Sequence, residues 1–422
     1  MRPEADRGGD RDGVGHGGIM QRREFIALAS AGFARPKSTP RVRAITRGPN
    51  YHWFGYYDKL QFDPGNRYVL AMRTGFEHRS PRPDDVIQLG RIDIHDHDRW
   101  TDLGETTAWC WQQGCMLQWL PGSSSEVIWN DREKGQYISR VLDLKSGQRR
   151  TLPGPIYALS PDGRHAVTTD FRRLADTRPG YGYNGIPDPN RDVLAPDDSG
   201  IWSMDLHSGE RKLIFSVRDA VRISCARYDW RGAKHWFNHL LYSPDGKRLI
   251  FLHRWTAAAG GPRRFNTRMF TISPEGRDPY VVDDFGGMSH FIWRDANHIL
   301  GWADRPPGGL AFYLYEDRTS RVEVVGAGIM TADGHCTYLP GNRWILCDTY
   351  PDPQRLQHPY LFDTNTNTRR PLGHFFSPPE YTGEWRCDTH PRISRDGSLV
   401  AIDSPHNGGR QIYLMDIRPI IS

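Results

Sequence analysis

A short pattern of hydrophobic and polar positions repeats along the chain from about residue 50 onward. Each unit has a short strand, a turn rich in Pro, Asp and Gly, an apolar strand, and a further strand that ends at an Asp-containing turn. Pro and Gly set the backbone angles that a tight turn needs. Typical apolar runs are RYVLAM, RLIFLH and LVAIDS. Such short strands, with no sustained apolar period of about 3.6 residues, predict an all-β protein.

The number of units predicts the architecture. The turns are Asp63–Gly65, Leu120–Gly122, Ser160–Gly163, Ser243–Gly246, Arg294–Asp295, Leu339–Gly341 and Ser394–Gly397. Seven units of four strands predict a seven-bladed β-propeller with one blade per unit. The last unit shows only three strands, and residues 41–46 (RVRAIT) can supply the fourth, which would remove exposed sheet edges. We therefore expect a single propeller domain over residues 41–422.

Composition and charge exclude some classes of function. Hydrophobic residues make up 37% of the chain, which is too many for a disordered protein. No apolar stretch approaches about 18 residues, so no membrane span is expected. Residues 1–47 hold ten Lys and Arg against five Asp and Glu, which leaves 45 of each sign in residues 48–422. This neutral body argues against a nucleic-acid surface, and we expect a monomer that acts on a small or polymeric substrate.

The first 40 residues are predicted to be a leader. Arg22 and Arg23 precede a short apolar segment that ends in small residues (ALASAGFA), as in a twin-arginine export signal. This pattern predicts a periplasmic or otherwise exported protein. The alternative is a disordered basic tail on a cytoplasmic protein.

Four histidines occupy one equivalent position in four successive units. They are His239, His290, His335 and His390, and each lies ten residues before an aliphatic residue of the next strand. In a propeller the innermost strand of each blade lines the central channel, so equivalent positions there converge on one axis. We expect the four histidines on these strands in blades four to seven.

The other polar positions near this register are unevenly distributed among the blades. Side chains two apart on a strand share a face, so Asp333 and Asp388 are expected one step above His335 and His390. Blade one offers Asp58, whereas blades two and three offer Met116 and Ile156 at the matching position. A one-sided polar cluster is what a site requires, and no ligand is expected from blades two and three.

The charge on such a cluster constrains its chemistry. Two charged imidazoles about 6 Å apart would repel by about 3 kcal/mol at an effective dielectric constant of about 20. Neutral imidazoles that converge are suited to hold a divalent metal ion, with Zn, Ca and others possible. The alternative is a set of hydrogen-bonded channel histidines that tie the blades together.

One long connection is expected on the same face as the histidines. Residues 171–200 contain Arg172, Arg173, Arg178 and Tyr181. Long loops in compact domains are usually functional or disordered, and arginine forks match carboxylates. We expect these four residues to bind an acidic sugar, the alternative being a solvated loop.

Several strings resemble the seven-bladed propeller polysaccharide lyases. The chain is similar to the oligogalacturonate lyases, and more loosely to the ulvan lyases, over most of residues 50–417. The resemblance rests on HWFGYYDKLQFDPGNRYVL, WQQGCMLQW, WFNHLLYSPDG, SHFIWRD, DGHCTYLPGNRWILCDTYP and RCDTHPRISRDG. It implies a channel metal, typically manganese, held by three His and a Gln.

By that resemblance the metal ligands are His290, His335 and His390, with His239 as the fourth ligand or as a base. The chain departs from the pattern in one respect, because Gln112 and Gln113 lie in another blade and the sequence offers no clear counterpart of the Gln.

The chemistry of uronate cleavage then assigns further roles. β-Elimination removes the proton at C5 once the neighbouring carboxylate is neutralised by a metal or by arginines. We expect His253 or His239 as the base and Tyr183 beside the leaving oxygen. Arg254, with Arg178, is expected to neutralise the carboxylate.

Two other functions are compatible with the sequence. One is a non-catalytic propeller that binds a glycan or a protein. The other is a propeller glycoside hydrolase, which needs two carboxylates roughly 5–9 Å apart in the site. Channel aspartates are available for the second.

Overall fold

The structure is a computed structural model that describes residues 39–256 and 265–422. Thr39–Ser422 forms one compact unit. The predicted leader and its twin-arginine motif lie outside the described residues, apart from residues 39 and 40. None of the described helices is long and apolar enough to cross a bilayer.

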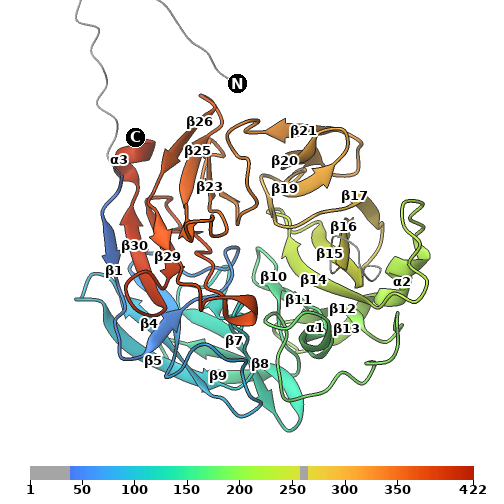
Figure 1. Ribbon diagram of the computed structural model, residues 1–422. Coiled ribbons are helices and arrows are strands. Elements are labelled where there is room, and N and C mark those ends of the chain that lie inside the picture. Colours follow the sequence, from blue (N-terminus) through green and yellow to red (C-terminus); the bar gives the residue numbers. More distant parts are fainter. Residues whose placement is uncertain (1–38, 257–264) are drawn as a thin grey trace, which may run out of the picture. The chain divides into compact units, whose positions relative to one another are not determined.

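Seven four-stranded antiparallel sheets are arranged in a ring around a central axis (Figure 1). Blade one contains β2 (Tyr51–Trp53), β3 (Tyr68–Thr74), β4 (Ile87–Asp93) and β5 (Arg99–Thr106). Blade two contains β6 (Gln118–Trp119), β7 (Glu126–Glu133), β8 (Gln136–Asp143) and β9 (Arg149–Leu152). Blade three contains β10 (Ala158–Leu159), β11 (His165–Thr168), β12 (Gly200–Asp205) and β13 (Arg211–Ser216). Blade four contains β14 (His235–Tyr242), β15 (Leu249–Thr256), β16 (Phe265–Ile272) and β17 (Tyr280–Gly286).

The remaining blades follow the same order, and the predicted seven-bladed propeller is confirmed. Blade five contains β18 (Phe291–Trp293), β19 (His298–Arg305), β20 (Gly309–Glu316) and β21 (Val322–Val325). Blade six contains β22 (Thr337–Tyr338), β23 (Trp344–Cys347), β25 (Tyr360–Asp363) and β26 (Thr368–Pro371). Blade seven contains β28 (Arg392–Ile393), β29 (Leu399–Ser404), β30 (Gln411–Asp416) and β1 (Val42–Ala44).

The first strand closes the ring, as the sequence predicts. β1 pairs antiparallel with β30, with Val42 opposite Met415 and Ala44 opposite Tyr413. The outermost position of blade seven is therefore filled from the start of the propeller. This pairing joins the two ends of the domain and satisfies the backbone groups that an edge strand would leave exposed.

The Ser-Pro-Asp-Gly turns explain why the blades form where they do. In blade four the Ser243 hydroxyl donates to Asp245 and accepts from the backbone N–H of Arg248 at 2.9 Å. Gly246 adopts φ +72°, and its N–H donates to the carbonyl of Ser243. These local bonds fix the hairpin between the inner strand and the second strand, and the aliphatic side chains that follow pack between blades.

Replacing Gly163 by Ala is expected to destabilise the fold strongly. Gly163 has φ +70°, and an added Cβ would lie 2.1 Å from the carbonyl oxygen of Pro121 in the preceding blade. Gly341 is a matched control, because it has φ +85° and nothing within 4 Å of an added Cβ. We expect Gly341→Ala to cost about 1–2 kcal/mol of unfolding free energy from left-handed strain alone. Gly163→Ala should lower the Tm further, and equal Tm values for the two variants would contradict this contact.

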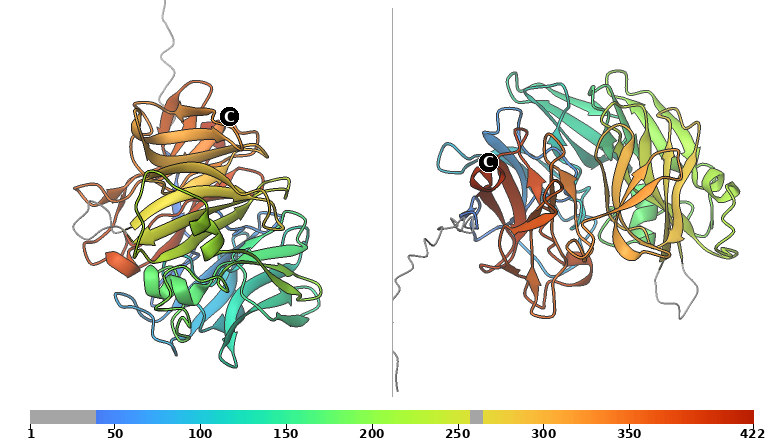
Figure 2. Two further views of the ribbon diagram at one scale, coloured as in Figure 1. Left: turned by 90° about the vertical axis from the view of Figure 1, so that its right-hand side faces the viewer. Right: turned by 90° about the horizontal axis from the view of Figure 1, so that it is seen from above.

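Two segments outside the blades lie on one face of the ring. They are α1 (Phe171–Thr177), which follows blade three's second strand, and the 3-10 turn η1 (Gly383–Trp385), which precedes blade seven (Figures 1 and 2). They come together at Gln112, whose backbone N–H donates to Gly180 and whose amide donates to Glu384. The remaining elements are α2 (Val217–Arg222), α3 (Arg418–Ile421), and the two-stranded ribbon of β24 (Leu356–Gln357) and β27 (Phe375–Phe376).

Candidate active site

The four repeat histidines converge, but not as residues of regular strands. Only His239 lies within a strand, at an irregularity in β14 where the backbone turns to φ 53°. His290, His335 and His390 each come just before the inner strand of their blade. The expected placement on the innermost strands is therefore corrected for these three. The direction of each of these three rings is therefore set by a short loop and not by the alternation of side chains along a strand.

Three of the rings pack directly against one another. The ring centres of His290 and His335 are 4.2 Å apart, and those of His335 and His390 are also 4.2 Å apart. These three side chains and His239 are between 1% and 4% exposed. The matching positions in blades two and three, Met116 and Ile156, are buried among apolar side chains. The polar cluster is one-sided.

Carboxylates fix two of these rings, the buried Asp348 and the partly exposed Asp333. His335 Nδ1 lies 3.0 Å from Asp348, which also accepts from the Thr389 hydroxyl, and His290 Nδ1 lies 2.9 Å from Asp333. A carboxylate that accepts from Nδ1 leaves Nε2 as the lone-pair nitrogen, as in many metal-ligating histidines. His335 Nε2 is buried and has no hydrogen-bond partner within the described residues. The ring is therefore prepared to bind a ligand at Nε2.

The donor set fits a divalent metal ion. His390 Nε2 is likewise buried without a hydrogen-bond partner in the described part of the chain. Ligand atoms of His335, Asp388 and His390 lie within 4.8 Å of one another. Two imidazoles and a carboxylate form a mixed nitrogen and oxygen set that suits Mn, Fe or Zn, and His290 packs beside them with its ring centre 4.2 Å from that of His335. The oxygen donor here is Asp388, whereas the amides of Gln112 and Gln113 donate to other groups.

The aspartates are distributed differently from the expectation based on strand alternation. Asp333 does not accompany His335 of its own blade and instead reaches His290 of blade five, while Asp348 from the end of β23 takes its place. Asp388 lies 3.9 Å from His390 Nε2 and pairs with Arg386 at 2.8 Å. The alternation argument fails because these residues precede the strands.

His239 is set apart from the other three histidines. Its ring stacks on Phe291 at 4.0 Å, and its Nε2 lies 3.3 Å from Asp58, which pairs with Lys59 at 3.0 Å. Burial lowers the pKa of His239 to about 4, despite the opposing effect of Asp58. Although burial alone would raise the pKa of Asp58, Lys59 and His239 hold it at about 2. At neutral pH this is a neutral imidazole beside a carboxylate, with Nδ1 buried and unpartnered within the described residues.

Two consecutive tyrosines lie between His239 and the other histidines. Tyr56 contacts the rings of His239 and His390 at 4.9 and 5.2 Å, and Tyr57 contacts those of His239 and His335 at 5.5 and 5.2 Å. The Tyr57 hydroxyl donates to the carbonyl of Phe291 at 2.7 Å, which ties blade one to blade five. Because of these two rings, His239 is not packed against the three-histidine cluster.

Two arginines at this site have unpaired donors. The guanidinium groups of Arg178 and Arg254 lie 4.7 and 4.8 Å over the ring of Phe265. Nε of both residues and one terminal nitrogen of Arg254 are buried without a hydrogen-bond partner in the described chain. Burial and the neighbouring charge of Arg178 lower the pKa of Arg254 to about 9. Two adjacent cations with free N–H groups form a site for an anion.

Tyr181 links this arginine pair to the histidine cluster. Its ring lies 4.2 Å from the Arg178 guanidinium, and its hydroxyl accepts from Arg386 at 2.7 Å. Burial alone would raise the pKa of Tyr181, but Arg386 and Arg178 lower it to about 8. The phenol is thus an unusually acidic group at the site.

Two predicted catalytic residues are placed elsewhere. His253 is fully buried in blade four, 2.9 Å from both His235 and Arg268. Tyr183 is fully buried, stacks on Phe171 at 4.0 Å, and accepts from the Asn130 amide. Neither side chain contacts the histidine cluster. The roles predicted for them are corrected, since His253 is held within blade four and Tyr183 is held between Phe171 and Asn130.

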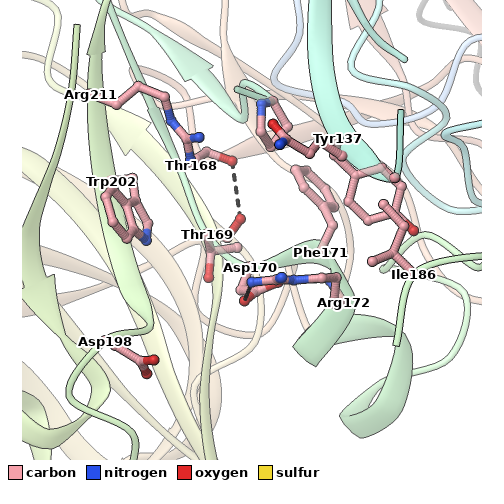
Figure 3. A pocket seen from close by; sticks show the side chains of 13 residues that line it. Tyr137, Thr168, Thr169, Asp170, Phe171, Arg172, Ile186, Asp198, Trp202 and Arg211 are labelled. Carbon is pink, nitrogen blue, oxygen red and sulfur yellow. Dashed lines mark hydrogen bonds and ion pairs between the residues drawn. The ribbon is translucent and has the colours of Figure 1, made fainter. Parts of the chain in front are cut away.

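Two predicted substrate-binding arginines are also placed elsewhere. Arg173 is buried and donates to Asp188 and to four backbone carbonyls, so it holds the long loop in shape. Arg172 pairs with Asp170 and lines a pocket of about 360 Å³ beside Trp202 and Arg211 (Figure 3). The expectation that these two residues reach the acidic sugar at the histidines is therefore corrected, whereas Arg178 and Tyr181 do reach the site.

Sequence reasoning missed several members of the site. Arg386, Tyr350 and Tyr56 had no assigned role, although all three belong to strings that carried the resemblance. Tyr350 places its hydroxyl 3.4 Å from His290 Nε2. Their closeness in sequence to the site aspartates could have identified them, because each lies within five residues of Asp348, Asp388 or Asp58.

Replacing Asp348 by Ala is expected to weaken metal binding by about 10–100-fold, because the carboxylate that orients His335 is lost. Asp348 is fully buried and also accepts from the backbone N–H of His335. Titration with manganese, followed by calorimetry, measures the change. Asp363→Ala is a matched control, since that carboxylate pairs with Arg343 on the outer part of blade six. Unchanged affinity in Asp348→Ala would count against this arrangement.

No protein-family model and no curated protein matches the sequence. Among solved structures, the chain is similar to oligogalacturonate lyase from Vibrio parahaemolyticus, with 13% identity, a TM-score of 0.63, and coverage of 90% of this chain and 94% of that one. It is equally similar to an oligogalacturonate lyase in complex with manganese, with 15% identity, a TM-score of 0.63 and the same coverage.

A peptidase domain has a more distant likeness. The β-propeller domain of the Trilobed protease from Pyrococcus furiosus has 10% identity and a TM-score of 0.51, over 86% of this chain and 96% of that one. At such identities similarity shows the fold alone. The fold is a seven-bladed β-propeller like that of the oligogalacturonate lyases.

Proposed function

We propose that the protein is a lyase that cleaves a uronate-containing oligosaccharide or polysaccharide by β-elimination. The observation that carries the proposal is the pair of Arg178 and Arg254, whose buried nitrogens have no hydrogen-bond partner within the described residues. Arg178 lies over the acidic phenol of Tyr181, and the ring of Tyr56 contacts both Tyr181 and the neutral His239. This combination offers the three elements that elimination from a uronate needs: neutralisation of a carboxylate, a base and an acid.

The arginine pair binds the substrate carboxylate. A guanidinium matches a carboxylate through parallel N–H bonds, and these bonds strengthen as negative charge develops on the carboxylate oxygens. Because neither Arg178 nor Arg254 forms an ion pair with a carboxylate of the described residues, a uronate would relieve the repulsion between them. Neutral sugars would leave these donors unsatisfied, so the site selects an acidic residue of the glycan.

His239 acts as the base that removes the C5 proton. Asp58 accepts from Nε2, which leaves the lone pair on Nδ1, an atom without a hydrogen-bond partner in the described part of the chain. When the proton arrives, the buried carboxylate of Asp58 stabilises the imidazolium.

Tyr181 acts as the acid beside the leaving oxygen. The Arg386 and Arg178 side chains make its phenol acidic enough to give up a proton near neutral pH. The bond between C4 and the leaving oxygen breaks as the C4=C5 double bond forms, and the phenol proton goes to that oxygen.

A divalent ion would be held by His290, His335 and His390 together with Asp388. When bound, it supplies Lewis acidity toward the substrate carboxylate. We propose manganese, since a structurally similar lyase is described with that metal.

Access to the site requires the covering segments to part. Each histidine is at most 4% exposed, and the Tyr181–Arg386 contact joins the segment after α1 to the segment after η1. We propose that the glycan enters between these two segments and replaces contacts that they make with each other.

The electrostatics of Asp58 and Asp348 disfavour either residue as the acid of a hydrolase. An inverting or retaining hydrolase needs one carboxyl group with a raised pKa that stays protonated as the acid. Asp58 and Asp348 both have lowered pKa values, because their cationic and hydrogen-bonding partners outweigh burial. Both are therefore ionised at neutral pH.

The rate is expected to follow a bell-shaped pH profile. The base His239 must be neutral, so kcat/KM should rise with pH through about 4. The acid Tyr181 must be protonated, so kcat/KM should fall as pH rises through about 8. In Tyr181→Phe the alkaline fall should disappear, along with most of the rate. An unchanged alkaline limb in that variant would assign the acid to another group.

Incubation with pectic, ulvan-type and glucuronate-capped oligosaccharides tests the proposed function. A lyase raises the ultraviolet absorbance of an unsaturated uronate in step with new reducing ends, and a chelator lowers both. Reducing ends without that absorbance would indicate hydrolysis. Neither signal on any of the three substrates would indicate a binding propeller.

A further inference from the structure

A pair of histidines faces each other outside the channel, at the end of the ribbon of β24 and β27. His358 Nδ1 and His374 Nδ1 are 2.6 Å apart, and the ring centres are 4.9 Å apart. His374 is exposed, and His358 is partly exposed. This pair belongs to blade six but makes none of the contacts described for the channel cluster.

The register of the two ribbon strands places the two histidines opposite each other. Gln357 pairs with Phe375, so the next residues along the two antiparallel strands, His358 and His374, stand directly opposite each other. Side chains at opposite positions have their Cβ atoms about 4.5–5.5 Å apart. Two imidazoles fixed at that spacing present two nitrogens to one point.

A carboxylate prepares one of the rings. His358 Nε2 lies 2.9 Å from Asp352 Oδ2, while Asp352 Oδ1 accepts from the backbone N–H of Leu356 at 2.8 Å. With Nε2–H donating to the carboxylate, the neutral ring has its lone pair on Nδ1, the atom that faces His374. A carboxylate that orients a histidine in this way is a common companion of metal ligands.

We propose that His358 and His374 form a second, surface site for a divalent transition-metal ion, with Nδ1 of both rings as ligands. Two metal–nitrogen bonds of about 2.0 Å separate the nitrogens by about 2.8 Å at a right angle and about 3.3 Å at a tetrahedral angle. The observed 2.6 Å is closest to the right-angle case, which the tetragonal geometry of Cu²⁺ provides. Because His374 is exposed, its ring can shift by a few tenths of an ångström, and water can complete the coordination.

Titration of the full chain with Cu²⁺, followed by electron paramagnetic resonance, tests this site. The channel cluster is intact in every variant, so differences report the ribbon alone. We expect the wild type to bind one more equivalent, with two imidazole nitrogens, than His374→Ala. Asp352→Asn, which preserves shape, should retain the equivalent but bind it about 10–100-fold more weakly. His207→Ala, which removes another exposed histidine, should match the wild type.

Equal copper stoichiometry in the wild type and His374→Ala would overturn the proposal, as would loss of an equivalent in His207→Ala. A shared proton between the two rings, seen by nuclear magnetic resonance together with no copper bound, would also overturn it. Uronate cleavage by His374→Ala should equal that of the wild type. Failure of the proposed lyase function would leave the copper difference intact, so the two ideas fail separately.

Discussion

His239→Ala is expected to lower kcat for elimination by about 10²–10⁴-fold, the usual contribution of a general base. The reason is the neutral ring beside Asp58, whose Nδ1 has no hydrogen-bond partner among the residues that the structure describes. Rates measured at saturating substrate isolate the effect on kcat. Metal content should stay unchanged, because the ring is stacked on Phe291 rather than against the other three histidines.

Two further variants sharpen this prediction. Asp58→Asn should lower kcat less than His239→Ala, because the base remains. It loses only the carboxylate that fixes its tautomer and stabilises its imidazolium form. His390→Ala should lower metal content as well as rate. If His239→Ala instead lost the metal, His239 would be a ligand, and the base would have to be another residue.

Arg254→Lys is expected to lower kcat/KM by about 10²–10³-fold, the usual cost of losing one preorganised donor for a developing oxyanion. Lysine keeps the charge but lacks the fork that matches a carboxylate, so the loss tests geometry rather than charge. Arg254 is 4% exposed, and two of its nitrogens have no hydrogen-bond partner within the described residues, so they are available to an anion.

Arg172→Ala provides the comparison. Its guanidinium pairs with Asp170 in the side pocket, away from the histidines, so this variant should retain near-wild-type kcat/KM. If Arg172→Ala lost much of its kcat/KM and Arg254→Lys lost little, the substrate carboxylate would instead bind in the pocket of Figure 3.

The blades could be predicted because their signals are local. The Ser243–Gly246 turn is fixed by bonds among its own residues, and the same holds at the Ser160–Gly163 and Ser394–Gly397 turns. The repeat then places equivalent residues near one axis, which is why the four histidines could be grouped. What the repeat does not encode is the atom through which each ring acts. That depends on Asp348, Asp333 and Asp58, which lie in other strands or other blades.

The misassigned residues show the same limit at single positions. His253 and Arg254 are neighbours on β15, so their side chains point to opposite faces, and only Arg254 points to the site. Tyr181 and Tyr183 are two residues apart in a loop, where no such alternation applies. Tyr183 is held by Phe171 within that loop, whereas Tyr181 meets Arg386 some 205 residues further along the chain. Contacts of that range leave no periodic trace in a single sequence.

The central claim is that the glycosidic linkage breaks by elimination and not by addition of water. Cleavage in water labelled with heavy oxygen, followed by mass spectrometry of the products, distinguishes the two directly. The account predicts unlabelled fragments in which the new non-reducing end carries a C4=C5 double bond. Fragments that carry one heavy oxygen and no double bond would contradict it.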